Sequence, residues 1–386
     1  MRTRSSRARI CEICGSPMKK NGHDRLGSQR WMCTDCNATR GVRHYRRRDR
    51  GELGAFLAWL LGPAAQPGPS RTFRRRTAGC WRIHPRLEPD GVVRHVLMAD
   101  GTYLRHGRCL LTAIDGASGA VVAFRWCRHE TTADYLALFE KIPAPDVLVC
   151  DGMRGIETAA RSAWPSTRIQ RCLVHVRRDC VNDLTHRPRL QAGRELKRLA
   201  DALVTIREPD QAARWAAQLH DWQHRWHAML HERTFAREHP DDPRAARQSW
   251  WWTHQPLRRC YRRLERLWRN GTLFAFHDPG LRDADGRPPQ RTSNRLEGGV
   301  NAPIKRMLVN HRGLSDEHRM LACEWLCYMK SEHPDPYRFL DQLHEQHKEG
   351  HPDDDTPGMG HGIDWNEFRH IGTKVIDLES GLPFRQ

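Results

Sequence analysis

The sequence lacks the features of membrane-spanning and exported proteins. It contains no run of about 18 uninterrupted apolar residues, so we expect no membrane span. The basic stretch at 1–14 is not followed by the apolar segment of a secretory signal. Without such a signal, the 13 cysteines are interpreted as reduced thiols and metal ligands rather than disulfides. We therefore expect a cytoplasmic protein.

Acidic residues are too few to balance the basic ones. The 386 residues include 64 Lys and Arg against 46 Asp and Glu, which gives a formal net charge of +18 and a pI of about 9.8. Such an excess is typical of proteins that bind a polyanion: DNA, RNA or an acidic membrane surface. The mean hydropathy is low, at −0.76, but 14 Trp residues indicate a folded chain. The length predicts about two to four folded units.

Four cysteines near the N-terminus form two C-x2-C pairs, Cys11 with Cys14 and Cys33 with Cys36. Each pair can turn two thiolates onto one metal ion, and four sulfurs complete a tetrahedral Zn²⁺ shell. We therefore predict structural zinc in a zinc ribbon over residues 1–45. The basic surroundings of this ribbon suit DNA phosphates, and a protein-contact module is the alternative.

Residues 46–90 have the order of a helix-turn-helix. Apolar residues spaced by three and four between Leu53 and Leu61 predict a helix, which Gly62-Pro63 stops. Ser70 can cap a second helix. That helix carries a cluster of basic side chains, Arg71, Arg74, Arg75 and Arg76. The second helix of a helix-turn-helix enters the major groove of DNA, so these are candidate DNA-binding residues. A basic linker helix is the alternative.

The elements predicted over residues 91–182 follow the order β-β-β-α-β-α-β. Three antiparallel strands over 94–127 precede a helix, a strand at 146–152, a second helix and a strand at 167–173. This order is typical of an α/β fold with a ribonuclease H-like mixed sheet. In that arrangement the first and fourth strands lie side by side.

Asp100 and Asp151 each follow an apolar strand and precede a glycine. If the two strands are neighbours, their ends bring two carboxylates together, and the repulsion between them is relieved by a bound Mg²⁺. Either aspartate alone is equally typical of a turn, and Asp115-Gly116 is interpreted as a turn only. The repeat of the same pattern favours a metal site.

A third carboxylate is expected within residues 291–308. Thr292 or Ser293 can cap a helix there, and Glu297 falls in its first turns. The spacing predicts that one helix face carries Glu297 together with Asn294, Asn301 and Lys305. This face suits a metal ion beside a phosphate backbone, and a solvated helix with an ordinary glutamate is the alternative. Gly298-Gly299 weakens the helix but permits a close approach.

Four blocks, "LMADGTYL", "LVCDGMRGI", "IQRCLVHVRRDC" and "TSNRLEGGVN", resemble those of DDE transposases of bacterial insertion sequences in the Mutator-like superfamily. The resemblance covers roughly residues 92–180 and 288–330. It implies that Asp100, Asp151 and Glu297 form the catalytic triad. It also implies cleavage and joining of element ends by two-metal-ion phosphoryl transfer, with Mg²⁺ as the metal and Mn²⁺ as a substitute. The implied partners are the terminal inverted repeats and target DNA, bound by a homodimer or higher homo-oligomer at the bacterial nucleoid.

The block at 169–180 contains Cys172 and His175 as C-x2-H, a pair that the resembling family often carries. The pair supports the active site, clamps a helix start, or forms half of a zinc site whose other half the sequence does not show. In the last block, Arg295 joins Asn294, Asn301 and Lys305 as a candidate DNA-binding residue.

The long interval between Asp151 and Glu297 predicts an inserted domain. We assign residues 183–290 to an all-helical insertion, 291–345 to the last helices of the core, and 346–386 to a tail that ends in one or two strands. Within the insertion, Trp250, Trp251 and Trp252 either pack internally or stack on a distorted DNA base. The histidines at 220, 224, 227 and 231 are interpreted as a polar helix face rather than a metal site.

The expected function is therefore that of a DNA transposase. Two alternatives remain open from the sequence. The first is a non-catalytic zinc-ribbon DNA-binding regulator derived from a transposase, and the second is another ribonuclease H-like nuclease.

Overall fold

The computed structural model describes residues 9–11, 13–23, 29–41, 45–62, 70–104, 107–340 and 342. The predicted tail over 346–386, with its expected strands, lies outside these residues. The described helices do not combine the length and apolar character needed to cross a membrane.

The cysteine-rich segment folds as a small antiparallel sheet. Its four strands, in the order β1-β2-β3-β4, are Arg9–Ile10, Pro17–His23, Gln29–Cys33 and Thr39–Gly41. Its buried centre consists of Cys11, Met18 and Cys33. So small a centre buries little apolar surface, which is typical of units that need a metal or a crosslink for stability.

The two helices predicted next are present, with shifted boundaries. Helix α1 covers Tyr45–Leu61, and helix α2 covers Arg71–Thr77 and continues as a 3₁₀ turn over Ala78–Arg82. Ser70 caps α2 as predicted, because its hydroxyl accepts a hydrogen bond from the Phe73 amide. The apolar face of α1, from Leu53 to Leu60, packs in the same cluster as side chains of the central sheet. This segment therefore shares its core with the central sheet.

The central sheet has five strands in the order β7-β6-β5-β8-β9. The strands are β5 (Val96–Leu104), β6 (Arg108–Asp115), β7 (Val121–Cys127), β8 (Val147–Cys150) and β9 (Arg168–Arg171). Strands β5, β6 and β7 pair antiparallel, whereas β8 pairs parallel to both β5 and β9. The predicted strand order and the predicted neighbourhood of the first and fourth strands are both present.

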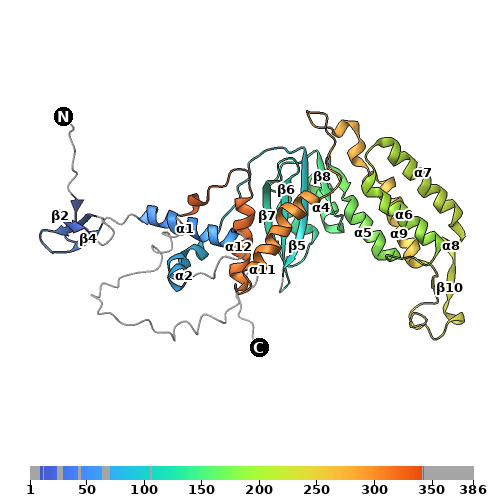
Figure 1. Ribbon diagram of the computed structural model, residues 1–386, viewed down its shortest axis with the longest axis horizontal. Helices are drawn as coiled ribbons and strands as arrows, with labels where there is room; N and C mark the ends of the chain where they lie inside the picture. The colour runs from blue at the N-terminus through green and yellow to red at the C-terminus, as the bar shows by residue number, and fades with distance from the viewer. Residues whose placement is uncertain are drawn as a thin grey trace. The chain divides into compact units, whose positions relative to one another are not determined.

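Alternate residues of β5 serve two cores. Leu97 and Ala99 pack with helices α3 (Thr132–Phe139) and α4 (Arg154–Ala163) on one face. Val96 and Met98 pack on the other face with α1 and the C-terminal helices (Figure 1). Because successive side chains of a strand point to opposite faces, the first four residues of β5, all apolar, are buried on both sides of the sheet.

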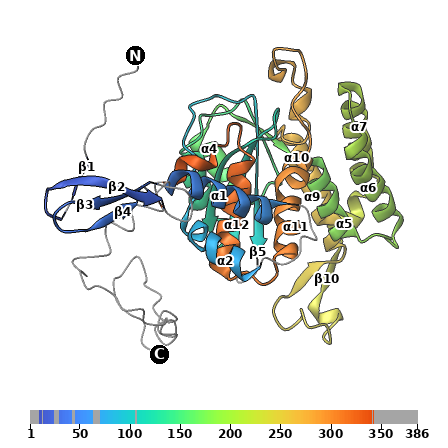
Figure 2. The same ribbon diagram turned by 60° about the vertical axis from the view of Figure 1, so that its left-hand side comes forward.

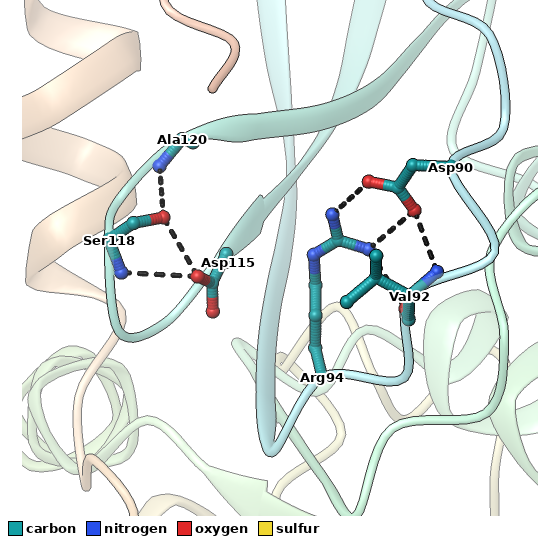
Figure 3. Close-up of polar contacts among 6 residues, drawn as sticks. All are labelled: Asp90, Val92, Arg94, Asp115, Ser118 and Ala120. Atoms are coloured by element: carbon teal, nitrogen blue, oxygen red, sulfur yellow. Dashed lines mark hydrogen bonds and ion pairs between the residues drawn. The ribbon is translucent and has the colours of Figure 1, made fainter. Parts of the chain in front are cut away.

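Two aspartates near the central sheet have local structural roles, which Figure 3 shows. Asp90 pairs with Arg94 and accepts a hydrogen bond from the Val92 amide, so it fixes the chain that enters β5. Asp115 accepts bonds from the amides of Ala117 and Ser118 and from the Ser118 hydroxyl. Asp115 is thus a turn residue, as the sequence indicated.

Residues 173–269 form a helical unit with a cluster of its own. Its helices are α5 (Leu173–Leu184), α6 (Gln191–Ala202), α7 (Pro209–Arg225), α8 (His227–His231) and α9 (Gln255–Arg269), shown together in Figures 1 and 2. The predicted boundary at residue 183 falls inside α5, whose apolar side chains already pack in this cluster.

The expectation of an all-helical insertion is wrong. Strands β10 (Arg233–Phe235) and β11 (Trp250–Trp252) pair antiparallel between α8 and α9. Both strands are short and rich in aromatic residues, which fit a pleated, half-buried surface better than a helix.

The segment predicted as one helix at 291–308 is interrupted. It starts as α10 (Asn294–Leu296), continues as a π-helix over Glu297–Asn301, and resumes as α11 (Ala302–Asn310), before α12 (Asp316–Met329). Pro303 has no N–H for the usual bond to residue 299, and Gly298-Gly299 tolerates irregular backbone. This combination favours a local π turn.

The role of Asp115 gives a stability prediction. Asp115→Ala removes three hydrogen bonds from the β6–β7 turn and should lower the free energy of unfolding by roughly 1–2 kcal/mol. Asp115→Asn keeps one acceptor oxygen and should lose less. Denaturant midpoints of the three proteins check this order, and an unchanged midpoint for Asp115→Ala would contradict it.

Candidate active site

The parallel pairing of β5 with β8 brings Asp100 and Asp151 to one edge of the sheet. Met98 pairs with Val149, and the same register continued by two residues sets Asp100 opposite Asp151. Strand β5 continues through Asp100 to Leu104, within the strand range that the sequence predicted, and only its pairing with β8 stops before Asp100. The carboxylate therefore sits on a rigid strand rather than on a loop.

The Asp100 side chain is half-buried and lies beside other acids. Burial raises the pKa of Asp100 to about 7, and the charges of Asp151 and Glu130 add to this rise. Its only hydrogen bond among the described side chains comes from the Asn301 amide, 3.1 Å from its Oδ2. A buried acid beside like charges is stabilised by a proton or by a cation.

Glu130 is a site residue that the sequence reasoning missed. Its carboxylate rests against Gly101, where a Cβ atom would come within 2.4 Å of the Glu130 Cδ. The Tyr135 hydroxyl donates a 2.6 Å bond to it, and burial raises the pKa of Glu130. In the sequence it only precedes a helix cap, Thr131, so no local pattern marks it.

Arg171 supplies positive charge behind Asp151 and was also missed. It donates to the Asp151 carbonyl and to Glu157, at 2.5 and 2.9 Å. Gly152 has a φ of +81° and leaves room for the guanidinium, since a Cβ there would lie 1.7 Å from the Arg171 Cζ. The glycine of the second Asp-Gly pair thus has a steric role as well as a conformational one.

The helix that carries Glu297 is attached to the sheet edge by polar contacts. The Ser293 amide donates to the Cys172 sulfur, at 3.3 Å, and the Ser293 hydroxyl donates to Glu297, at 3.2 Å. His175 Nε2 lies 3.5 Å from the Glu297 carboxylate. Asn301, at the end of the π turn, reaches Asp100. The C-x2-H pair and Glu297 therefore adjoin one another, and the helix start is clamped at Cys172.

The charges of this pair are coupled. Burial opposes ionisation of the Cys172 thiol, but hydrogen bonds from His175 and Ser293 outweigh it and lower the pKa of Cys172. The bond to Cys172 in turn raises the pKa of His175, against the effect of burial. The His175 charge also acts on Asp100, whose pKa it lowers.

Two groups of potential metal ligands occur in the described part of the chain. The first group consists of Cys11, Cys14, Cys33 and Cys36, and the second of Cys172, His175 and Glu297. Within each group, the potential ligand atoms all lie within 4.8 Å of one another. Asp100, Asp151 and Glu297 do not form such a group by that distance. Glu297 is connected to Asp100 through Asn301 and through the charge of His175.

The four cysteines converge as their spacing predicted. Cys11 and Cys36 sulfurs lie 3.6 Å apart, and those of Cys14 and Cys33 lie 3.4 Å apart. Hydrogen bonding with Ser16 lowers the pKa of Cys14 to about 6. Four converging thiols of this kind could hold a Zn²⁺ ion.

The candidate DNA-binding residues have different surroundings. All four arginines of α2 are exposed, and Arg76 also pairs with Glu52. Arg295 donates to the Gly116 carbonyl, so it braces the β6–β7 turn.

Of the three residues predicted to share a face with Glu297, only Asn301 contacts Asp100. Asn294 is exposed, and Lys305 lines a groove beside Tyr103 and Arg108. The π turn changes the helical phase on which that prediction relied.

Two comparisons with known proteins bear on this site. The family model "Transposase, Mutator family" matches residues 121–253. The chain is also 32% identical over 101 residues to the transposase for insertion sequence element IS905 of Lactococcus lactis subsp. lactis (strain IL1403). That match covers 22% of this chain and 26% of the relative, so the chain spans about a quarter of the length of this curated relative. The family match includes Asp151, Cys172 and His175 and ends before Glu297.

The raised pKa of the half-buried Asp100 predicts a pH-dependent stability. Its carboxyl group has a pKa near 4 when unfolded and about 7 when folded, so its contribution to stability is fully present below pH 4 and is lost as the pH rises through 7. A tenfold change in the proton affinity of the group corresponds to about 1.4 kcal/mol. In Mg²⁺-free buffer, the denaturant midpoint of the wild type should fall over this range relative to Asp100→Asn. Parallel pH profiles would contradict it.

Proposed function

From the membership of this chain in the Mutator family of bacterial insertion-sequence transposases, we propose that it is a DDE-type DNA transposase that cleaves and joins element ends. The observation that carries this proposal is the pairing of β5 with β8, which sets Asp100 beside Asp151, with the Glu297 helix hydrogen-bonded to Asp100. Such carboxylates on adjoining strands and one helix suit phosphoryl transfer.

The proposal includes a ribonuclease H-like core. Its support is the mixed sheet β7-β6-β5-β8-β9, with three antiparallel strands followed by two parallel ones. The helical unit between β9 and α10 would be the insertion that interrupts this core.

The carboxylates fit Mg²⁺ by their chemistry. Asp100 and Asp151 are hard oxygen donors, and the burial and neighbouring acids that raise the pKa of Asp100 support a site for a counter-charge. We assign Asp100, Asp151 and Glu297 as the residues that would hold the metal. When bound, Mg²⁺ would supply activation of the attacking oxygen and stabilisation of the leaving 3′ oxygen.

The remaining residues position these carboxylates. Asn301 orients Asp100, Arg171 holds the Asp151 backbone, and Ser293 and His175 hold Glu297. Glu130 adds negative charge beside Asp100 and keeps its place through Tyr135. Such support keeps catalytic groups within a narrow range of positions.

The other parts of the chain would act on DNA. We propose that the cysteine-rich sheet is a zinc ribbon and that α1 and α2 form a helix-turn-helix-like segment, which together recognise double-stranded terminal repeats in the bacterial cytoplasm. The exposed Arg71, Arg74 and Arg75 support this assignment. Joining two element ends would require at least a homodimer.

The central test uses two aspartates of different roles. Asp100→Asn should abolish Mg²⁺-dependent nicking of DNA that carries the element ends, because a metal ligand and its charge are lost. Asp115→Asn should keep nicking, since Asp115 serves only a turn. Nicking of labelled duplexes with Mg²⁺ or Mn²⁺ measures both variants.

The outcomes separate the alternatives. Nicking by Asp100→Asn at the wild-type rate would refute the catalytic assignment. DNA binding without any cleavage by the wild type would favour a non-catalytic regulator. Cleavage without joined products would favour another nuclease of this fold.

The zinc ribbon gives a separate prediction. The wild type should purify with one zinc ion per chain, because four thiolates complete its coordination. Cys14→Ser should lose most of this zinc. Cys172→Ser should retain it, because Cys172 belongs to the other ligand group. Zinc content measured by elemental analysis checks this, and equal zinc in wild type and Cys14→Ser would contradict it.

A further inference from the structure

Helix α9 borders a groove that is rich in arginine. The groove has a volume of about 630 Å³, and five of its eight lining residues are arginines, with Glu265 as its one acidic residue. The arginines are Arg258, Arg259, Arg262, Arg263 and Arg266. Three of them follow at four-residue spacing, from Arg258 to Arg266, and so share one helix face.

Only part of this charge is neutralised within the chain. Arg259 and Arg263 both pair with Asp183 of α5, which is buried. Arg262 and Arg266 are exposed, and no ion pair or side-chain hydrogen bond among the described residues involves either of them. Like charges four residues apart on a helix repel each other, so the folded chain gains from an external anion here.

Arg258 shows a second sign of an absent partner. It is buried, its guanidinium lies 3.7 Å from the centre of the Trp252 ring, and it donates to the Leu230 carbonyl. Its Nε has no hydrogen-bond partner within the described part of the chain, although buried N–H groups rarely lack one. Burial and the neighbouring Arg262 lower the pKa of Arg258, but an arginine remains charged at neutral pH.

The tryptophans of β11 brace these arginines. Arg233 lies over the rings of both Trp250 and Trp252, at 4.3 and 5.1 Å, and Trp251 is buried. The ring faces are therefore used by guanidinium groups of the chain itself. This arrangement offers no free aromatic platform of the kind that binds unpaired bases.

We infer that the α9 groove binds the sugar–phosphate backbone of duplex DNA. This inference rests on the proposed function, which supplies DNA as the substrate. Guanidinium forks match phosphate oxygens in pairs. The span from Arg258 to Arg266 is about 12 Å at 1.5 Å per residue. One DNA strand presents a phosphate about every 3.4 Å along its axis, so this span faces three or four phosphates.

The test compares two double variants with equal charge loss. Arg262→Gln/Arg266→Gln removes the unpaired groove arginines, and Arg198→Gln/Arg214→Gln removes exposed arginines of α6 and α7 outside the groove. Each full-length protein is titrated onto two fluorescent duplexes at several salt concentrations. One duplex comes from the DNA flanking the reading frame and the other has an unrelated sequence.

The groove variant should bind both duplexes more weakly, because phosphate contacts carry no base information. Each phosphate contact contributes a slope of about −0.9 to the plot of log affinity against log salt, so two lost contacts should make the slope shallower by about 1.8. The control variant should keep the wild-type slope, and circular dichroism should show the same fold for all three.

Each other result overturns the inference in a distinguishable way. A groove variant with the wild-type slope would overturn the groove while leaving the proposed transposase function intact. An equal change in the control variant would overturn it also, because total charge would then explain the loss. A wild type that binds neither duplex would overturn both the groove and the proposed function.

Discussion

The parallel pairing of β5 with β8 is the constraint on which the candidate active site depends. It sets two carboxylates, Asp100 and Asp151, opposite each other at an edge that is covered on both faces by apolar side chains. Burial of Asp100 raises its pKa, and the neighbouring charges add to this effect. The free energy of packing the sheet thus holds together groups that repel each other. Under the proposed function, a bound cation would relieve this repulsion.

In the Asp-Gly pairs at 100–101 and 151–152, each glycine leaves room for a charged side chain, and the two charges have opposite sign. Gly101 leaves room for the carboxylate of Glu130, which adds negative charge beside Asp100. Gly152 leaves room for the guanidinium of Arg171, which fixes the Asp151 backbone from behind. An additional carboxylate therefore lies beside Asp100, whereas a guanidinium group holds the backbone of Asp151. The same dipeptide serves as an ordinary turn at Asp115, where the aspartate bonds to its own loop.

Much of the sheet could be predicted from the sequence, because buried strands and capped helices leave local patterns such as the apolar run before Asp100 and the cap at Thr131. The contacts that complete the site left no such pattern. Glu130 and Arg171 reach the two aspartates only through tertiary packing. The π turn that begins at Glu297 depends on the missing N–H of Pro303 and on the permissive backbone of Gly298-Gly299. The spacing of apolar residues does not reveal such a turn. The β10–β11 ribbon was missed because each strand has only three residues, too few to display alternation.

Helix α5 connects the candidate active site with the arginine groove. His175, in its first turn, contacts Glu297, and Asp183, in its last turn, pairs with two of the groove arginines and offsets one of their two charges. Eight residues separate these two side chains, which corresponds to about 12 Å along a helix. Between these ends, Val176, Cys180 and Leu184 pack the helix into the apolar cluster of the helical unit. A DNA backbone held in the groove would therefore have a fixed distance from the carboxylates, which positions one phosphate for reaction through contacts made with others.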